Sequence, residues 1–170
     1  MKKALFISLF IFVLTLSGCE SAPDVREQIS LPMSFTACTK GSDSPYSVYI
    51  TSDYCDIEFV GSDMLTGAKL HFEQGKSKST VGEFSFEIDE NSFPAMKALI
   101  KAIRALAANE NSGIVAENGV KYTIDETVIL VYYDIETEAI VGIRTEELGR
   151  VFEFTLTDLN PYEAQSNGAS

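Results

Sequence analysis

Short runs in which apolar and polar residues alternate recur from residue 33 onward and predict β-strands. The clearest is Glu83–Ile88, where apolar residues at even positions alternate with polar residues at odd positions. Strict alternation is typical of a strand with one buried and one solvated face. Similar short runs, bounded by turn-forming residues, predict further strands: Met33–Thr39, Ser47–Ser52, Cys55–Val60 and Ala68–Gln74. The stretch Gly75–Ser79 is polar and glycine-led, which favours a loop.

One segment has helical periodicity instead. Met96, Leu99, Ile103 and Leu106 recur at spacings of three or four residues, as on the apolar face of an amphipathic helix. Pro94 suits the first turn, where no amide donor is needed. A helix is therefore predicted from about residue 94 to residue 109. The side chain of Asn91 or Ser92 could cap it.

A meander of four strands is predicted after the helix. Its second member, Val128–Tyr133, is continuously apolar, which indicates a central strand covered on both faces. Short connections between the four make neighbouring strands antiparallel. The predicted fold class is therefore α+β: a meander-rich antiparallel sheet, able to curl, with one main helix packed on it. The other three strands are Val120–Ile124, Ala139–Arg144 and Arg150–Thr157.

The first residues follow a different pattern. Lys2 and Lys3 precede an almost wholly apolar stretch, Ala4–Leu16. As a helix this stretch would reach only about 20 Å, short of the roughly 30 Å hydrocarbon core of a bilayer. The combination is typical of a secretory signal.

The residues that close this signal, Leu16-Ser17-Gly18-Cys19, resemble the lipobox of bacterial lipoproteins. The resemblance implies cleavage before Cys19, a diacylglycerol on its thiol and, in many bacteria, a third acyl chain on its amino group. A membrane anchor through Cys19 follows, since more than one acyl chain holds a protein stably. In enterobacterial lipoproteins, Asp after the lipidated Cys retains the protein in the inner membrane. Because this residue is Glu20 here, the resemblance implies an outer-membrane, periplasm-facing location. The inner membrane and a Gram-positive cell membrane are the alternatives.

These features predict four regions. Residues 1–18 form the signal peptide. Residues 19–32 comprise the lipidated Cys and a polar, flexible tether interrupted by Pro23 and Pro32. Residues 33–162 form a single α+β domain, of a size that can bury its own core. Residues 163–170, which are small and polar, form a disordered tail. Beyond the lipobox, we assign the chain no family resemblance from its residues.

Charge narrows the classes of partner. Removing residues 1–18 takes away two of the 13 basic residues and none of the 25 acidic ones, so the formal net charge goes from −12 to −14. This balance argues against nucleic acid, which requires a basic surface. The basic side chains Lys97, Lys101 and Arg104 share one face of the predicted helix and could dock an acidic partner. An ordinary solvated helix face is the alternative.

Two cysteines remain after the lipidated one, Cys38 and Cys55, with 16 residues between them. In an oxidising extracytoplasmic space such a pair is a disulfide candidate. The chain-entropy model gives a bridge of this length roughly 3 kcal/mol of stabilisation.

Residues that could carry catalysis are sparse. His71 is the single histidine, so neither a zinc site nor a Ser-His-Asp arrangement is favoured. No catalytic residue, metal ligand or cofactor is therefore assigned. We expect a protein-binding or envelope accessory module whose partner is another envelope protein, or a purely structural envelope protein. The alternative from another class is an envelope-polymer hydrolase that uses carboxylates such as Asp53, Asp56 or Asp134.

Overall fold

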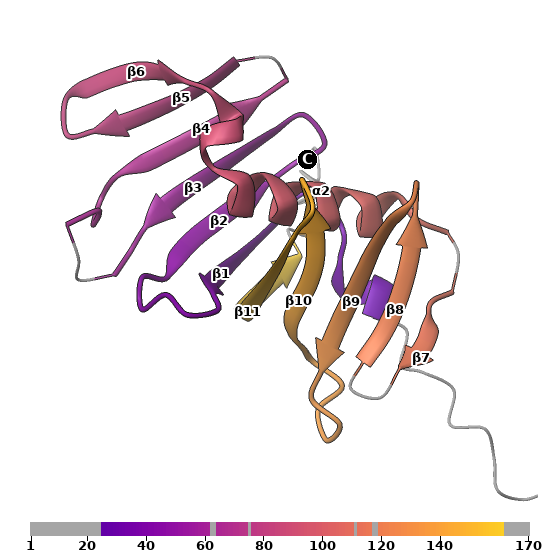
Figure 1. Ribbon diagram of the computed structural model, residues 1–170. Coiled ribbons are helices and arrows are strands. Elements are labelled where there is room, and N and C mark those ends of the chain that lie inside the picture. Colours follow the sequence, from indigo (N-terminus) through magenta and orange to yellow (C-terminus); the bar gives the residue numbers. More distant parts are fainter. Residues whose placement is uncertain (1–24, 62–63, 75, 111, 117–118, 162–170) are drawn as a thin grey trace, which may run out of the picture.

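The computed structural model describes residues 25–61, 64–74, 76–110, 112–116 and 119–161. Within these residues, eleven β-strands form one antiparallel sheet and a single α-helix packs on it (Figure 1). The strands are β1 (Met33–Thr39), β2 (Tyr46–Ile50), β3 (Tyr54–Phe59), β4 (Lys69–Glu73), β5 (Lys76–Val81), β6 (Phe84–Ile88), β7 (Ile114–Ala116), β8 (Gly119–Ile124), β9 (Thr127–Tyr133), β10 (Ile140–Glu147) and β11 (Arg150–Pro161). The helix is α2 (Pro94–Ala108), and short 3-10 turns lie at η1 (Val25–Gln28) and η2 (Glu90–Ser92).

The sheet consists of two meanders that meet at its centre. Strands β1 to β6 follow one another outward on one side, and β11 to β7 do so on the other. The two sides are joined by antiparallel pairing between β1 and β11, the first and last strands of the chain. Among the described strands the sheet is not closed, so β6 and β7 are its two edges.

Helix α2 connects these two edges. Because β6 and β7 lie at opposite sides of the sheet, the chain between them has to cross it, and Figure 1 shows α2 lying across the face of the central strands. The 15 residues of α2 span about 22 Å at the rise of an α-helix. The apolar face predicted for the helix is buried, including Leu99, Ile103 and Leu106.

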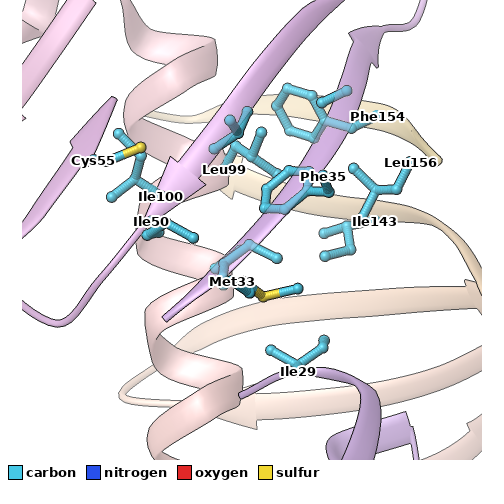
Figure 2. Close-up of a cluster of buried hydrophobic side chains, with 14 of the residues drawn as sticks. Ile29, Met33, Phe35, Ile50, Cys55, Leu99, Ile100, Ile143, Phe154 and Leu156 are labelled. Atoms are coloured by element: carbon cyan, nitrogen blue, oxygen red, sulfur yellow. The ribbon is translucent and has the colours of Figure 1, made fainter. Parts of the chain in front are cut away.

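The core lies between α2 and the inner face of the sheet. Figure 2 shows side chains from the helix meeting those of central strands from both meanders. Phe35 and Ile50 come from the first meander, and Ile143, Phe154 and Leu156 come from the second; all are buried. The core therefore depends on pairing between the two ends of the chain.

The predicted fold class is confirmed in its outline, an antiparallel sheet with one main helix packed on it. The sheet is larger than predicted because residues 76–81, which include most of the predicted polar loop, form β5. Ser77 and Ser79 of this strand are buried, which is compatible with their small side chains. Strand β7 was also not predicted.

The segment before β1 packs against the domain. Val25 and Ile29, which fall in the predicted tether, are both buried. Gln28 Nε2 donates a hydrogen bond to the Glu138 carbonyl at 2.8 Å, and the Ile140 amide donates to Gln28 Oε1 at 3.0 Å. The predicted signal, the lipobox with Cys19 and the tail lie outside the described residues. None of the described helices combines the length and the hydropathy needed to cross a membrane.

Candidate functional site

Strand β6 forms an edge of the sheet and is exposed along most of its length. It pairs only with β5 among the described strands. Phe84 is 78% exposed and Phe86 is 51% exposed, which is unusual for large aromatic side chains in a strand. Native proteins commonly protect a sheet edge with Lys, Pro or a bulge. Strand β6 contains no Lys or Pro, and its register with β5 runs without a shift.

The exposed phenylalanines lie on the same face of the sheet as α2. Cross-strand partners share a face, and Phe86 is opposite Ser79, which is itself opposite the buried Leu70. One pair further along, Phe72 contacts the ring of Phe93, the residue that precedes α2, with centroids 6.4 Å apart. The inner face therefore runs from the covered strand β4, across the buried Ser77 and Ser79 of β5, to the uncovered strand β6.

The turn before β6 determines which backbone groups face outward. Two residues, Gly82 and Glu83, connect the paired residues Val81 and Phe84. In a hairpin of this length the flanking pair exchanges both backbone hydrogen bonds, and every second pair along the ladder does the same. The N–H and C=O groups of Ser85 and Glu87 therefore point away from β5, toward the free edge.

Other exposed apolar side chains gather at the same end of the sheet. Successive antiparallel strands place the end of β3, the start of β4, the end of β5 and the start of β6 together (Figure 1). We call the exposed set at this end the apolar corner. An exposed apolar patch of this kind commonly marks a binding surface. The apolar corner comprises Val60, Met64, Leu65, Val81, Phe84 and Phe86.

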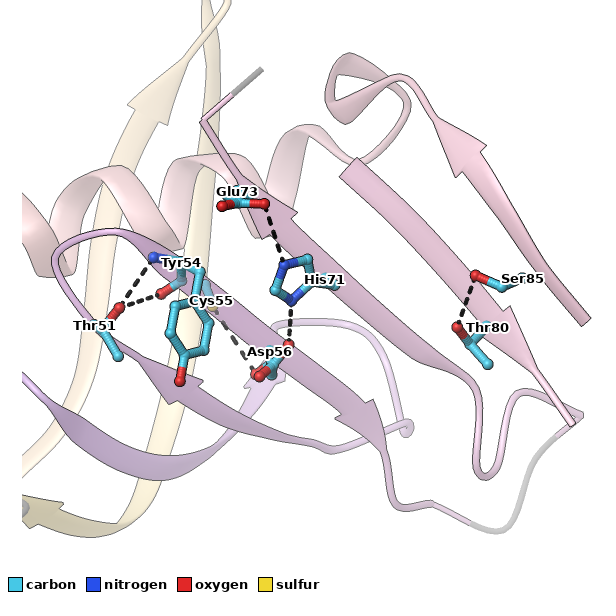
Figure 3. A network of polar contacts seen from close by, with 8 residues as sticks. All are labelled: Thr51, Tyr54, Cys55, Asp56, His71, Glu73, Thr80 and Ser85. Carbon is cyan, nitrogen blue, oxygen red and sulfur yellow. Dashed lines mark hydrogen bonds and ion pairs between the residues drawn. The ribbon is translucent and has the colours of Figure 1, made fainter. Parts of the chain in front are cut away.

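The outer face of the same strands carries polar side chains (Figure 3). His71 Nδ1 lies 2.6 Å from Asp56 Oδ1, and His71 Nε2 lies 4.0 Å from Glu73 Oε2. The neighbouring Lys69 Nζ lies 3.1 Å from Glu58 Oε2. Both ring nitrogens of His71 therefore face carboxylates rather than a serine hydroxyl. Among the described residues, no group of three or more His, Cys, Asp or Glu side chains could hold a metal ion.

The predicted docking residues on α2 make contacts within the chain. Lys97 Nζ donates to Asn91 Oδ1 at 2.8 Å and lies 3.9 Å from Glu147 Oε1. Lys101 Nζ lies 3.3 Å from Glu147 Oε2. Arg104 Nε donates to the Thr51 carbonyl at 3.1 Å. The three side chains thus connect α2 to β10 and to the β2–β3 turn, and a docking role for them stays a prediction.

A cavity of about 580 Å³ lies beside this helix face. Asp53, Glu73 and Glu90 line it together with Lys97 and Arg104, so charges of both signs are present. One buried nitrogen, Arg104 Nη2, has no hydrogen-bond partner in the part of the chain that the structure describes. That nitrogen is fully covered, so it does not present a donor to the cavity.

The three carboxylates named for a hydrolase are not brought together. Asp53 lines the cavity beside α2, whereas Asp56 lies on the outer face against His71. Asp134 lies in the β9–β10 turn, where it accepts hydrogen bonds from the Thr137 amide, the Thr137 hydroxyl and the Glu136 amide. The hydrogen bonds from Thr137 lower the pKa of Asp134.

The predicted Cys38–Cys55 disulfide is wrong, because both cysteines are free. Cys55 is opposite Ile50, whereas Ala37, the neighbour of Cys38, is opposite Tyr46. The two partners, Tyr46 and Ile50, are four residues apart along β2, which is a distance of about 13 Å. The two cysteines are therefore separated by well over the roughly 7 Å between Cα atoms that a disulfide can bridge. Cys55 is buried on the inner face, and Cys38 alternates with the buried Ala37 and so lies on the outer face.

Sequence reasoning did not identify β6 as the strand that forms the free edge. The alternation of Phe84, Phe86 and Ile88 was visible and predicted a half-buried strand. Alternation alone does not say whether another element covers the apolar side. That β6 is the last strand on its side of the described sheet depends on strand order, which alternation does not encode.

Comparisons with known proteins identify no family. No protein-family model and no curated protein matches the sequence. Among solved structures, the chain is similar to an uncharacterised conserved protein from Thermus thermophilus, with 10% identity over 81% of this chain and 82% of that chain and a TM-score of 0.44. It is also similar to a LolA superfamily protein from Nitrosomonas europaea, with 8% identity over 84% of this chain and 94% of that chain and a TM-score of 0.38.

Proposed function

We propose that the protein is a lipid-anchored, extracytoplasmic module that binds another envelope protein. The anchor is the acylated Cys19 that the lipobox resemblance implies. The binding surface is the free edge of β6 together with the apolar corner. A single observation carries the proposal: a sheet edge with outward backbone groups also presents Phe84 and Phe86, 78% and 51% exposed.

The two parts of this surface suit the binding of an extended protein segment. Unpaired N–H and C=O groups on an edge can add a partner strand, and adjacent side-chain contacts then give selectivity. Large aromatic side chains contribute strongly to the free energy of binding when a partner buries them. Polymers without a peptide backbone would use only the second of these features.

Photo-crosslinking in living cells of the producing organism tests the proposal. The full-length lipoprotein carries a photoreactive phenylalanine analogue in place of Phe84. A matched control carries it in place of Val151, which is 55% exposed on β11 but distant from the edge. We expect a discrete crosslinked protein band from position 84 that is absent from position 151.

A crosslinked band shared by both positions would indicate nonspecific contact and contradict the proposal. Absence of protein crosslinks at position 84, in cells where the lipoprotein is present at its normal level, would also contradict it. Mass spectrometry of the band from position 84 identifies the partner.

A further inference from the structure

We infer that the β6 edge accepts an extended strand in which apolar residues alternate with basic ones. This inference rests on the proposed function and specifies the chemistry of its partner. Side chains of an added strand would point alternately to the two faces of the sheet. The two faces next to β6 differ sharply in chemistry, so they select different residues.

The inner face selects apolar residues. Phe84, Phe86 and Ile88 lie along β6 on this face, and the first two are more than half exposed. An incoming strand would place every second side chain beside them, where it extends the apolar surface of Phe84, Phe86 and Ile88. Aromatic and β-branched side chains are the residues that such cross-strand contacts favour.

The outer face selects basic residues. On the neighbouring strands, acids of β3 are paired with cations of β4, as in Glu58–Lys69 and Asp56–His71. On β5 the outward Lys78 is opposite Glu87 of β6. No described strand lies beyond Glu87, so among the described residues the carboxylate has a cation on one side and solvent on the other. A basic residue on an added strand would occupy that second side.

A second copy of this chain fits the edge less well than a basic segment. Antiparallel pairing of β6 with itself would place Phe86 opposite Phe86 and Ser85 opposite Glu87, which is acceptable locally. However, each chain carries a formal net charge of −12, and the edge is only five residues long. Such a contact is small compared with the roughly 800 Å² that each partner buries in a stable interface.

Binding of designed peptides tests the inference. The lipidated full chain is placed in nanodiscs of zwitterionic phosphatidylcholine, with empty nanodiscs as the blank. One nine-residue probe alternates Val and Lys, a second alternates Val and Glu, and a third is the Val/Lys peptide with N-methylated amides. We expect the Val/Lys peptide to bind about tenfold more tightly than the Val/Glu peptide and the N-methylated peptide not to bind.

Three variants assign this binding to β6. Glu87→Lys should abolish or reverse the preference for the basic peptide. Glu136→Lys, in the exposed β9–β10 turn, makes the same change in net charge and should leave the preference intact. Ser85→Pro removes an amide that faces the free edge, so it should abolish binding of both peptides while β5–β6 pairing is retained.

Each other outcome overturns the inference. Equal binding of both peptides, or binding that survives Ser85→Pro, shows that the charge or the edge plays no part. A doubled mass by analytical ultracentrifugation that Ser85→Pro abolishes shows that a second copy occupies the edge. Crosslinking at position 84 without any charge preference leaves the proposed protein-binding function standing and removes only the specified partner chemistry.

Discussion

Two buried side chains that can lose a proton, Cys55 and Tyr46, lie on the inner face of neighbouring strands. Burial raises the pKa of the Cys55 thiol to about 12, and the nearby Arg104 guanidinium opposes this only in part. Burial also raises the pKa of the Tyr46 phenol to about 12, against the opposing effect of its hydrogen bond with Thr39. Both side chains are therefore neutral in the folded protein over the physiological range of pH.

These shifts predict loss of stability in alkaline solution. The unfolded chain ionises at the ordinary pKa values, about 8.5 for Cys and 10 for Tyr. A folded-state pKa above these values means that the stabilisation is complete below the unfolded pKa and is lost as pH rises toward about 12. Between the two pKa values each group should lower the free energy of unfolding by about 1.4 kcal/mol per pH unit.

Urea unfolding at several values of pH between about 8 and 11 measures this dependence. Tyr46→Phe should make the dependence shallower above about pH 10, and Cys55→Ala should do so from about pH 9. Tyr132→Phe makes the same substitution at a partly exposed position and is the matched control. Identical slopes in the wild type and the three variants would contradict the assignment of the alkaline loss of stability to Tyr46 and Cys55.

At the scale of elements, α2 is held over the sheet by its apolar face and by ion pairs at one end of β10. The Glu147 side chain is only 10% exposed, and its carboxylate lies near both Lys97 and Lys101. The N-terminus of the helix differs from prediction: Phe93 occupies the N-cap position without a side-chain hydrogen bond. The preceding turn is capped instead by Asp89, which accepts from the Asn91 amide.

Glu147→Gln tests the link between α2 and β10. The substitution keeps the shape of the side chain and removes its charge, so two lysines lose their shared partner. We expect the free energy of unfolding to fall by about 1 kcal/mol, because the pair is only partly screened by solvent. Glu146→Gln, at the neighbouring exposed position, is the control and should change the free energy of unfolding little. Equal effects of the two variants in urea unfolding would show that the ion pairs of Glu147 do not stabilise the fold.

At the scale of the whole molecule, the sheet brings the beginning and the end of the chain together. Strand β1 pairs with β11, and the segment containing Val25 and Ile29 packs against the second meander through Gln28. The apolar corner lies on the far side of the first meander from this pairing. The described segment before β1 therefore lies beside the second meander, on the opposite side of the sheet from the β6 edge.

Cys19→Ser tests the anchor. The substitution removes the thiol that would carry the diacylglycerol, so the protein should move from the membrane fraction to the soluble fraction of lysed cells. The wild-type chain, fractionated in parallel, is the reference for the position of the anchored form. Membrane retention of the variant at the wild-type level would mean that something other than Cys19 holds the protein there.

Periodicity in the sequence was sufficient for most of the local elements. Helix α2 was predicted to within a residue of its observed bounds, and alternation correctly indicated a strand at β6. These properties are local, because the spacing of apolar residues determines which side of a helix or strand they occupy. Strand β5 was missed because its inward residues, Ser77 and Ser79, are polar and carry no hydrophobic signal.

Position in the sheet was decided only by the tertiary structure. Phe84 and Phe86 have the same pattern as buried strand residues, and they are exposed because β6 is last in the strand order and α2 lies over the central strands. Cys38 and Cys55 are close in sequence, but the register of β1, β2 and β3 separates them along the strands and across the two faces. The strand order, the position of the helix over the sheet and the strand register arise from contacts between distant segments of the chain. The local spacing of apolar residues contains no information about them.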